Sequence, residues 1–553
     1  MLKKIVLTFF SIAAFLVCAV PGFAADEVHF TVTGPASVTF DWRGLSSSDD
    51  KISYGTCSDC ESTTVTAYTP SPLPFSSSGP YFEAKLTGLA NNTVYYYKIG
   101  ANAEKTFKTA PPPGGSGFIV TAESDIGDST SYFNMAIMQN MIATINPDVS
   151  LVAGDITYGA DHGQSKVDQH FNDVMVWSQT IPYMPAWGNH EWDQSTDDMR
   201  NYLGRFGLPN SYSSPIESSY TTACPQNLGK DWYWFDYGNA RFIAYPEPFG
   251  NCGSYSSNSM DWTDWFNKVQ SVMQDAQNNT NIQFIVTWGH RPAYSSGHHP
   301  GDPTLKGYLV YLGDHFSKYV LNINGHSHNY ERTYPQHGVT HITAGTGGAD
   351  LEQDGSCLWL ACAQPSWSAV RYMRQGVIKL IFGSTGIVGQ FICGPAGGGV
   401  NDVTCNQGDV IDSFTIGTVS SPTASLSANP TSITSGQSSA LTWSSTDAVS
   451  CVGTGFSTGN AISGSASVAP SATTTYSVSC TGPGGTATAS ATVTVTSAFT
   501  YTLSGGSAVS VVAGGSVSQT GTAKLTGARN TSAQSGSVSV ATAASNEIGR
   551  AHV

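Results

Sequence analysis

One arrangement recurs five times in the middle of this chain and constrains its fold more than any other feature. A short apolar run ends in a glycine or a tight turn, and an aspartate, asparagine or histidine follows. The runs and their polar followers are Phe118–Thr121 with Asp125, Asp148–Ala153 with Asp155, Tyr183–Trp187 with Asn189, Ile282–Trp288 with His290, and Val320–Ile323 with His326 and His328. Such strands, alternating with amphipathic stretches, predict a layered α/β domain.

We expect these polar side chains to meet, because ligands of open α/β sheets bind beyond the carboxyl ends of the strands. Carboxylate, amide and imidazole without thiolate make a borderline-to-hard metal site, and these ligands are too many for one ion. Asp155 could bridge two ions about 3.5–4 Å apart, which would clamp the attacking and leaving oxygens of a phosphoryl group.

Each piece also has a simpler explanation when taken alone. The Asp125 segment could be a turn, Asp155 could lie in a helix cap, and Asn189 could satisfy loop backbone groups. His290 could be a core histidine, and His326 and His328 could be surface imidazoles. All five strand ends would then need the correct residue type by chance, so a metal centre is the better interpretation.

Composition divides the chain around this α/β block, which we place at residues 116–416. Residues 26–113 hold short alternating runs between Gly, Ser, Asn and Pro clusters, a pattern that predicts an antiparallel β-sandwich. Within them Leu86–Tyr97 resembles the signature of fibronectin type III modules. Pro111–Gly115 forms a linker at the end of the N-terminal sandwich.

In the α/β block, Phe133, Ile137, Met141 and Ile145 follow one another at four-residue steps, which predicts that they share one face of a helix.

After Gly417 charged residues almost vanish and an alternating Ser, Thr, Ala and Val pattern predicts β structure. Residues 422–496 resemble a bacterial immunoglobulin-like module in which Cys451 and Cys480 bridge the sandwich. Residues 497–547 look like the start of a further β module. Residues 548–553 break the pattern and match what a sequencing adapter would encode, so we interpret them as an artefact.

The N-terminus predicts export. Lys3 and Lys4 precede an apolar run from Ile5 to Val20, and small residues end it, so residues 1–24 are typical of a signal peptide. No other run is long and apolar enough to span a bilayer. We therefore expect a secreted, periplasmic or extracellular protein with no membrane span once the signal is removed.

The cysteines agree with an oxidising compartment. Of the eleven, Cys18 lies in the signal, and the other ten fall into pairs close in sequence. Nearest-neighbour pairing predicts five local disulfides: Cys57–Cys60, Cys224–Cys252, Cys357–Cys362, Cys393–Cys405 and Cys451–Cys480. The net charge of −15 argues against a nucleic-acid partner, since phosphate neutralisation needs basic residues.

The motifs together resemble a known family. D-x-G, G-D-x-x-Y, G-N-H-E, a strand-end histidine and G-H-x-H follow one another in the order of the metallophosphoesterases. Three longer segments narrow the resemblance: His290-Arg-Pro-Ala-Tyr294, Gly325-His-Ser-His-Asn-Tyr-Glu-Arg332 and His341-Ile-Thr-Ala-Gly-Thr-Gly-Gly348. With the preceding sandwich, the chain from about Val28 to Ile416 is similar to purple acid phosphatases of the long, plant-like type.

The resemblance implies a ferric ion and a divalent ion, the latter Fe, Zn or Mn. It places Fe(III) on Asp125, Asp155, Tyr158 and His328, and the divalent ion on Asp155, Asn189, His290 and His326. Donor chemistry supports this division, because phenolate and carboxylates are hard anions that suit Fe(III). A phenolate on Fe(III) would colour the protein, and a metal-bound hydroxide would be the nucleophile.

Three further histidines are predicted to act on the substrate. His190 follows the ligand Asn189 and should point at the phosphate or its leaving group. His298 and His299 follow the ligand loop, and one of them should protonate the leaving alkoxide or bind phosphate. His299 is slightly favoured because it is farther from His290. His162, His170 and His337 are expected at the surface.

The sequence therefore predicts a secreted acid phosphatase that hydrolyses phosphate monoesters. A phosphodiesterase or nucleotide-hydrolysing enzyme would share every metal ligand and stays an alternative. A second alternative is a cell-wall or polysaccharide-binding protein whose phosphatase domain is secondary, with the C-terminal immunoglobulin-like region making that contact.

Overall fold

The computed structural model describes residues 25–74, 79–163, 165–191, 200–212, 230–247, 262–352, 363–397, 403–496, 500–504 and 522–526. The predicted signal peptide, the last six residues and the pairs Cys224/Cys252 and Cys357/Cys362 lie outside these ranges. The chain forms two compact units. One comprises Met1–Gly114, Thr121–Ile378 and Phe391–Asp412; the other comprises Gly115–Val120, Lys379–Gln390 and Ser413–Val553.

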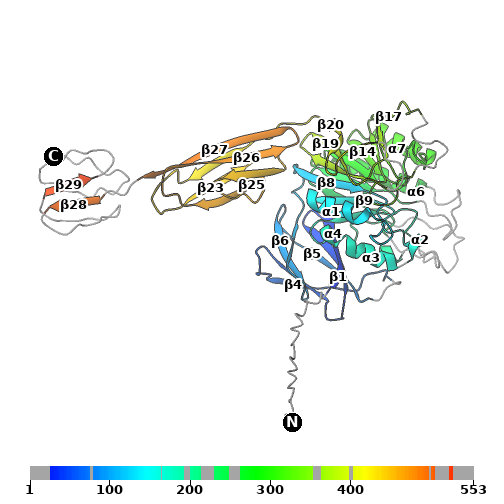
Figure 1. Ribbon diagram of the computed structural model, residues 1–553, viewed down its shortest axis with the longest axis horizontal. Helices are drawn as coiled ribbons and strands as arrows, with labels where there is room; N and C mark the ends of the chain where they lie inside the picture. The colour runs from blue at the N-terminus through cyan, green and yellow to red at the C-terminus, as the bar shows by residue number, and fades with distance from the viewer. Residues whose placement is uncertain are drawn as a thin grey trace, which may run out of the picture. The chain divides into compact units, whose positions relative to one another are not determined.

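The first domain is the predicted N-terminal β-sandwich (Figure 1). The short alternating runs at 38–42, 51–54, 81–86, 94–99 and 105–108 all form strands, and two more strands, β1 and β4, join them. One sheet has the order β1 (Ala25–Gly34), β2 (Ser37–Gly44), β5 (Tyr81–Thr87). The other has the order β4 (Thr63–Thr66), β3 (Lys51–Gly55), β6 (Val94–Ile99), β7 (Lys105–Lys108). Phe40, Tyr97 and Phe107 fill the core between the sheets.

The central region, residues 118–417, contains two sheets. The first has the order β10 (Tyr183–Ala186), β9 (Val149–Ala153), β8 (Phe118–Glu123), β18 (Gly376–Phe382), β19 (Gly386–Cys393), β20 (Val410–Gly417). The second has the order β11 (Trp234–Tyr237), β12 (Ala240–Ala244), β13 (Phe284–Trp288), β14 (Tyr319–Asn324), β16 (Thr340–Ala344), β15 (Tyr330–Thr333), β17 (Ser368–Tyr372). Tyr233 Oη donates to the Pro185 carbonyl at 2.7 Å and joins the two sheets.

Helices cover the outer faces of these sheets. Buried side chains of α1 (Met135–Ile145), α3 (Ser165–Asp173) and α4 (Met175–Ser178) share a core with β9, β10, β18 and β19 of the first sheet. Those of α6 (Thr263–Asn278) and α7 (Pro303–His315) share a core with β12, β13 and β14 of the second. Two short helices, α2 (Gly159–His162) and α5 (Arg200–Leu203), complete the described set. The predicted layered architecture is confirmed.

Two expectations about this region are wrong. Phe133 does not belong to the buried face of α1, which begins at Met135; its side chain is 88% exposed. His170 is not a surface residue. It lies buried on α3, with Nδ1 2.7 Å from the Gly127 carbonyl and Nε2 3.1 Å from Tyr183 Oη. Polar backbone and hydroxyl partners inside the core satisfy a histidine that the sequence alone could not place.

The N-terminal sandwich is joined to the central region by an ionic network. Arg205, 1% exposed, contacts Glu27 of the sandwich and donates to Asp168 at 2.6 Å. Arg43 of the sandwich reaches the same Asp168 at 2.8 Å and Asp26 at 2.6 Å. Because a buried charge is costly without its partner, these residues hold the two domains together as one structure.

The C-terminal segment forms a smaller pair of sheets. One has the order β21 (Ser425–Asn429), β23 (Ser439–Ser444), β25 (Ser463–Val468); the other has β22 (Ser432–Thr434), β27 (Gly485–Thr496), β26 (Thr474–Gly482), β24 (Ser450–Thr454). Their core holds Leu441, Trp443, Tyr476 and Val493. The backbone of β28 (Thr500–Ser504) pairs with that of β29 (Thr522–Thr526). The immunoglobulin-like assignment stays a prediction.

Three predicted disulfides are present: Cys57–Cys60, Cys393–Cys405 and Cys451–Cys480. The expectation that the last one bridges two sheets is wrong. Cys451 and Cys480 are directly paired neighbours on β24 and β26, within one sheet. The pair was correct, but spacing does not reveal which strands are neighbours.

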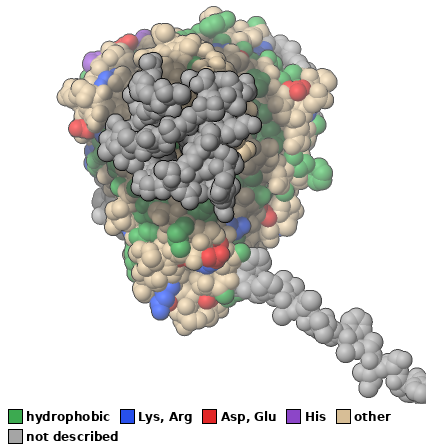
Figure 2. Space-filling model, turned by 90° about the vertical axis from the view of Figure 1, so that its left-hand side faces the viewer, with side chains coloured by type: hydrophobic (Ala, Val, Ile, Leu, Met, Phe, Trp, Pro, Cys, Tyr) green, Lys and Arg blue, Asp and Glu red, His purple; other side chains and the backbone are tan. Residues whose placement is uncertain are grey.

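Surface composition follows the low charge of the chain, in which 11% of residues are Asp, Glu, Lys or Arg. Figure 2 shows a face on which tan side chains and backbone predominate among the coloured atoms, with acidic and basic side chains scattered between them. Within the described residues, no helix is long and apolar enough to cross a membrane.

Candidate metal centre

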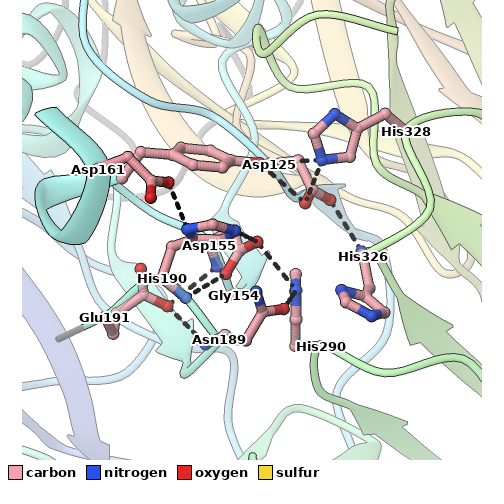
Figure 3. A network of polar contacts seen from close by, with 12 residues as sticks. Asp125, Gly154, Asp155, Asp161, Asn189, His190, Glu191, His290, His326 and His328 are labelled. Carbon is pink, nitrogen blue, oxygen red and sulfur yellow. Dashed lines mark hydrogen bonds and ion pairs between the residues drawn. The ribbon is translucent and has the colours of Figure 1, made fainter. Parts of the chain in front are cut away.

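Three predicted ligands meet at one point, and we name Asp125, Tyr158 and His328 the first ligand group. Tyr158 Oη lies 3.2 Å from Asp125 Oδ1 and 3.0 Å from His328 Nε2. His328 Nε2 lies 3.1 Å from Asp125 Oδ1 (Figure 3). His328 Nδ1 donates to the Asp350 carbonyl at 2.6 Å, which directs Nε2 toward the other two donors.

The other predicted ligands, Asp155, Asn189, His290 and His326, form the second ligand group. His290 Nε2 lies 3.0 Å from Asp155 Oδ2 and 3.0 Å from Asn189 Oδ1 (Figure 3). Its Nδ1 donates to the Ala153 carbonyl at 3.0 Å, so Nε2 faces the group. One ligand atom each of Asp155, His290 and His326 lies within 4.8 Å of the others.

Strand ends from both sheets supply these residues. Asp125, Asp155 and Asn189 follow β8, β9 and β10 of the first sheet, whereas His290, His326 and His328 follow β13 and β14 of the second. The predicted convergence is therefore present, although it is made where two sheets meet rather than along one. The Asp155 carboxylate lies near His290 of the second group and near His190, and its bridging of two ions stays a prediction.

Four of the candidate ligands have a backbone conformation that residues with a side chain rarely adopt. Asp125, Asp155, Tyr158 and His326 all have positive φ values, of 59°, 48°, 54° and 68°. Side chains with a Cβ rarely adopt this left-handed conformation, which costs of order 1–3 kcal/mol at each position. Such conformations persist where the surrounding structure determines them, and they concentrate at functional sites.

Two glycines allow the ligand loops to approach one another. A Cβ added at Gly188 would lie 2.2 Å from the Asp155 backbone nitrogen, and one at Gly325 would lie 2.4 Å from Asp125 Oδ2. Neither position can carry a larger residue without displacing a ligand aspartate. The glycines that ended the apolar runs in the sequence are therefore part of the site's construction.

Glu191 connects two of the loops, a role that sequence reasoning missed although the residue belongs to the quoted G-N-H-E motif. Its buried carboxylate accepts from the backbone nitrogens of Asp155 at 3.0 Å, Ile156 at 2.8 Å and Gly188 at 2.5 Å. Burial and the nearby charge of Asp155 raise the pKa of Glu191 to about 8. This carboxyl group fixes the Asp155 loop against the Asn189 loop.

Neighbouring charges within the site act on the pKa values of the ligand residues against or together with burial. Burial raises the pKa of Asp155, but His290 and His190 outweigh it and hold that pKa below its ordinary value. Burial lowers the pKa of His328, yet Asp125 raises it to about 9. Burial, together with Asp125 and Asp155, raises the pKa of the Tyr158 phenol. Ionising this phenol therefore requires a strong positive charge at the first group.

The ligand groups open into a cleft of about 840 Å³. Five of the seven candidate ligands belong to its described lining: Tyr158, His328, Asp155, Asn189 and His326. The other lining residues are Tyr132, Asp161, His190, Arg291, His299, Pro300, Asp350, Leu351 and Glu352. His190 Nδ1 lies 2.5 Å from Asp161 Oδ2, and its Nε2 lies 3.9 Å from Asp155 Oδ2 (Figure 3). Burial lowers the pKa of His190, but Asp155 and Asp161 outweigh it and raise the pKa to about 9.

The two histidines of the following loop differ in position. The ring of His299 stacks on that of His326 at 3.9 Å and lines the cleft. Its Nε2 lies 3.5 Å from Glu352 Oε2. His298 packs edge-on against His299 at 4.4 Å and is not part of the described lining. Asp161 and Glu352, the carboxylates beside the candidate catalytic histidines, had no recognisable signal in the sequence.

The donor set fits a pair of cations. Each group brings a carboxylate and at least one imidazole to within about one hydrogen-bond length, and His290 and His328 are oriented by main-chain carbonyls as metal ligands usually are. Within the described residues the first group adds a phenol and the second adds an amide and another imidazole. Oxygen and nitrogen donors without thiolate suit hard and borderline ions.

Comparisons with known proteins agree with this geometry. The family model of calcineurin-like phosphoesterases matches residues 120–330, and that of the purple acid phosphatase N-terminal domain matches residues 25–110. The human protein "Acid phosphatase type 7" is 24% identical over 418 residues, which are 65% of this chain and 85% of that protein.

An Arabidopsis thaliana protein named "Probable inactive purple acid phosphatase 1" is 27% identical over 347 residues. The match covers 54% of this chain and about half, 52%, of that relative. Among solved structures, a purple acid phosphatase from yellow lupin (Lupinus luteus) seeds aligns with a TM-score of 0.56 and 20% identity. That alignment covers 71% of this chain and 74% of the lupin chain, and it supports the fold.

Proposed function

We propose that this chain, a member of the purple acid phosphatase family of calcineurin-like phosphoesterases, hydrolyses phosphate monoesters at a binuclear metal centre. One observation carries the proposal: seven candidate ligands from two sheets lie in two groups, and five of them line one cleft. An accessible cleft over paired metal ligands is what a phosphate ester needs in order to reach both ions.

We assign Fe(III) to the first ligand group and a divalent Fe, Zn or Mn ion to the second, with Asp155 shared. When bound, the metals supply positive charge to the phosphoryl group and lower the pKa of a bound water. The types of donor atom in the two groups support this assignment. The first group combines a phenol with a carboxylate, whereas imidazoles and an amide dominate the second.

The chain's own residues complete the proposed reaction. His190, held by Asp161, faces the cleft beside Asp155 and can orient a phosphoryl oxygen by hydrogen bonding. His299 lines the cleft and is the better placed of the two loop histidines to protonate the leaving oxygen, with Glu352 beside it. His298 then supports the ring of His299 from the side.

The test is elemental analysis of the purified protein together with its visible spectrum and its turnover of three substrates. We expect iron plus a second metal, a visible absorption band, and release of phosphate from aryl and alkyl monoesters at acidic pH. Faster cleavage of an activated diester than of any monoester would favour the phosphodiesterase alternative. A protein that binds both metals but cleaves none of the three would contradict the proposal, an outcome to be considered because one relative carries "inactive" in its name.

We further propose that the protein is exported and that its C-terminal sheets contact a cell wall or polysaccharide. The N-terminal sequence pattern and three disulfides support export, because such bonds persist in oxidising compartments. Deleting residues 418–553 should leave phosphatase activity intact and release the protein from cells or polymer. Equal retention of the full and shortened chains would contradict the contact.

A further inference from the structure

Glu331 has no part in the proposed reaction, although it belongs to the segment Gly325–Arg332 that carries two candidate ligands. It lies on β15, three residues after His328, and the residue is 1% exposed. A buried carboxylate needs hydrogen-bond donors in place of the water it has lost. The positions of its donors therefore show which segments of the chain Glu331 connects.

Glu331 binds the loop that carries the candidate acid His299. Ser296 donates to it twice, from the backbone nitrogen to Oε2 at 2.7 Å and from the hydroxyl to Oε1 at 2.8 Å. The hydroxyl of Ser368, on β17, donates to Oε1 at 2.6 Å. Hydrogen bonds to a charged carboxylate are stronger than those between neutral groups. Two of them from one residue attach the middle of this loop to β15.

The same loop, residues 292–302 between β13 and α7, is attached at two other places. The backbone nitrogen of Asp302 donates to the Pro292 carbonyl at 2.8 Å and closes the base of the loop. The backbone nitrogen of His299 donates to Ser327 Oγ at 3.4 Å. Because the base is closed, the contacts of Ser296 and His299 determine how the rest of the loop lies over the cleft.

Gly297 brings this loop directly against the loop of the candidate ligands His326 and His328. A Cβ added at Gly297 would lie 2.2 Å from Ser327 Oγ and 2.2 Å from Asn329 Oδ1. Both of these side chains are buried, and Ser327 Oγ donates to Asn329 Oδ1 at 2.7 Å. The position of the His299 loop is therefore set relative to the ligand loop with little space for displacement.

We infer that Glu331 is a positioning residue that sets the place of His299 in the cleft by binding Ser296, and thereby determines how fast esters with a poor leaving group react. The inference rests on the proposed function for the role of His299 as the acid. A general acid must come within about 2.6–3.2 Å of the oxygen that it protonates. A displacement of about 1 Å can cost on the order of 10²-fold in rate.

The first experiment measures hydrogen exchange of residues 292–302 in the metal-loaded protein by mass spectrometry. Glu331→Gln should speed exchange of this loop about 10-fold, the usual worth of a hydrogen bond to a charged group. Ser296→Ala should act in the same direction but less strongly, because its backbone nitrogen still donates. Ser368→Ala is the matched control: it removes a hydroxyl from the same Glu331 oxygen but lies outside the loop, so exchange should not change.

The second experiment compares kcat/KM for 4-nitrophenyl phosphate, an activated aryl ester, with that for glycerol 2-phosphate, an alkyl ester. Glu331→Gln and Ser296→Ala should raise the aryl-to-alkyl ratio, the former about 10-fold, because only the alkyl ester depends on a well-placed acid. Ser296→Thr keeps the hydroxyl donor and should keep the ratio of the wild type, as should Ser368→Ala. Metal content and unfolding temperature are measured for each variant.

A double-variant cycle separates positioning from a merely structural role. In a His299→Asn protein, adding Glu331→Gln should leave the aryl-to-alkyl ratio unchanged, because Glu331 acts on this ratio through His299. A residue needed only for stability would instead lower the turnover of both esters alike, with or without His299. A further rise of the ratio in the double variant would overturn the inference.

The two experiments separate failure of the inference from failure of the proposed function. An unchanged ratio in metal-loaded Glu331→Gln, in a protein that hydrolyses both esters, would overturn the inference while the proposed function stands. Loss of metal from Glu331→Gln and Ser296→Ala, with equal losses on both esters, would also overturn it and assign Glu331 to support of the ligand loop. A wild-type protein that hydrolyses neither ester would contradict the proposed function, and the exchange rates would still decide whether Glu331 holds the His299 loop.

Discussion

The two ligand groups are built alike but present different donors. In each, a histidine is oriented by a main-chain carbonyl, and an aspartate lies about 3 Å from the imidazole Nε2. The first group adds the Tyr158 phenol, whereas the second adds the Asn189 amide and the His326 imidazole. The shared construction sets the geometry, and the added donors set the charge that each group can neutralise. This difference predicts two unlike ions in one centre.

The largest effect is expected where the two groups depend on one residue. Asp155→Ala should lose both ions, because its carboxylate serves both in the proposed centre. Since a metal pair contributes several kcal/mol to transition-state stabilisation, turnover should fall at least ~10³-fold. Metal analysis checks this, with Asp350→Asn, a cleft carboxylate of neither group, as the control. A variant that still holds two ions would show that the groups do not share Asp155.

Tyr158→Phe removes the donor that distinguishes the first group. The side chains differ by one phenolic oxygen, so the fold should persist while the visible absorption of the iron protein disappears. The spectrum of the variant, taken at equal iron content, is the measurement. A wild-type protein that is fully loaded with iron and colourless would contradict the assignment of Fe(III) to the first ligand group.

The next prediction concerns the side of the centre from which the leaving group departs. His299→Asn should slow hydrolysis of an alkyl phosphate about 10²- to 10⁴-fold and that of an activated aryl phosphate much less, because only a poor leaving group needs a proton. His298→Asn is the matched control and should affect both substrates weakly. Equal losses on both substrates for both variants would indicate phosphate binding by the pair, with His190 or water as the acid.

Glu191→Gln tests whether the second group is held by its surroundings. The variant weakens the connection between the Asp155 and Asn189 loops. Affinity for the divalent ion should fall about 10- to 100-fold, as for other supporting residues of metal sites, while iron is largely retained. Glu331→Gln is the control, because Glu331 is also buried and accepts from Ser296 and Ser368. Equal loss of both ions would mean that Glu191 supports the two groups alike.

The smallest effect contrasts the site histidines, whose pKa neighbouring carboxylates raise, with histidines whose pKa is lowered mainly by burial. Burial lowers the pKa of His170 to about 4, whereas the pKa of His328 is raised by Asp125. Because the unfolded chain binds a proton near pH 6.5 and folded His170 does not, stability should fall as the pH drops from about 6.5 toward 4, by about 1.4 kcal/mol per pH unit.

Urea unfolding at pH 7 and pH 5 measures this change. His170→Gln should show less acid destabilisation than the wild type, by about 1–2 kcal/mol. Burial also lowers the pKa of His29 to about 4 and that of His341 to about 3, so part of the effect should remain in the variant. An identical pH dependence in both proteins would show that His170 has the same pKa in the folded and the unfolded state.

How far the sequence predicts this molecule depends on the kind of residue. Most of the ligands could be found because an apolar run and then a glycine or a tight turn precede them, and the loops approach too closely to allow other residues at Gly188 and Gly325. The strands themselves were found because each is a short apolar run. That they belong to two sheets was not predictable, because pairing partners leave no local pattern.

The misplaced residues have specific causes. Phe133 matched the helical spacing of α1 but precedes its first turn, and spacing carries no information about where a helix begins. His170 was assigned to the surface, yet two buried groups satisfy its ring: the Gly127 carbonyl accepts from Nδ1, and the Tyr183 hydroxyl lies 3.1 Å from Nε2. Asp161, Glu191 and Glu352 act on other side chains from distant positions or through backbone groups, and only the folded geometry reveals them.

The ionic network of Arg205, Glu27, Asp168 and Arg43 has a practical consequence for anyone who wishes to shorten this protein. The proline-rich stretch Pro111–Gly115 resembles a natural cutting point, and a fragment beginning there would retain every metal ligand. It would also retain Arg205 and lose Glu27, leaving a guanidinium inside the protein with one of its carboxylate partners removed. Removing one partner of a buried pair costs about 3–5 kcal/mol, a large share of an ordinary domain's stability. The smallest useful expression fragment therefore begins at Ala25 rather than after the prolines.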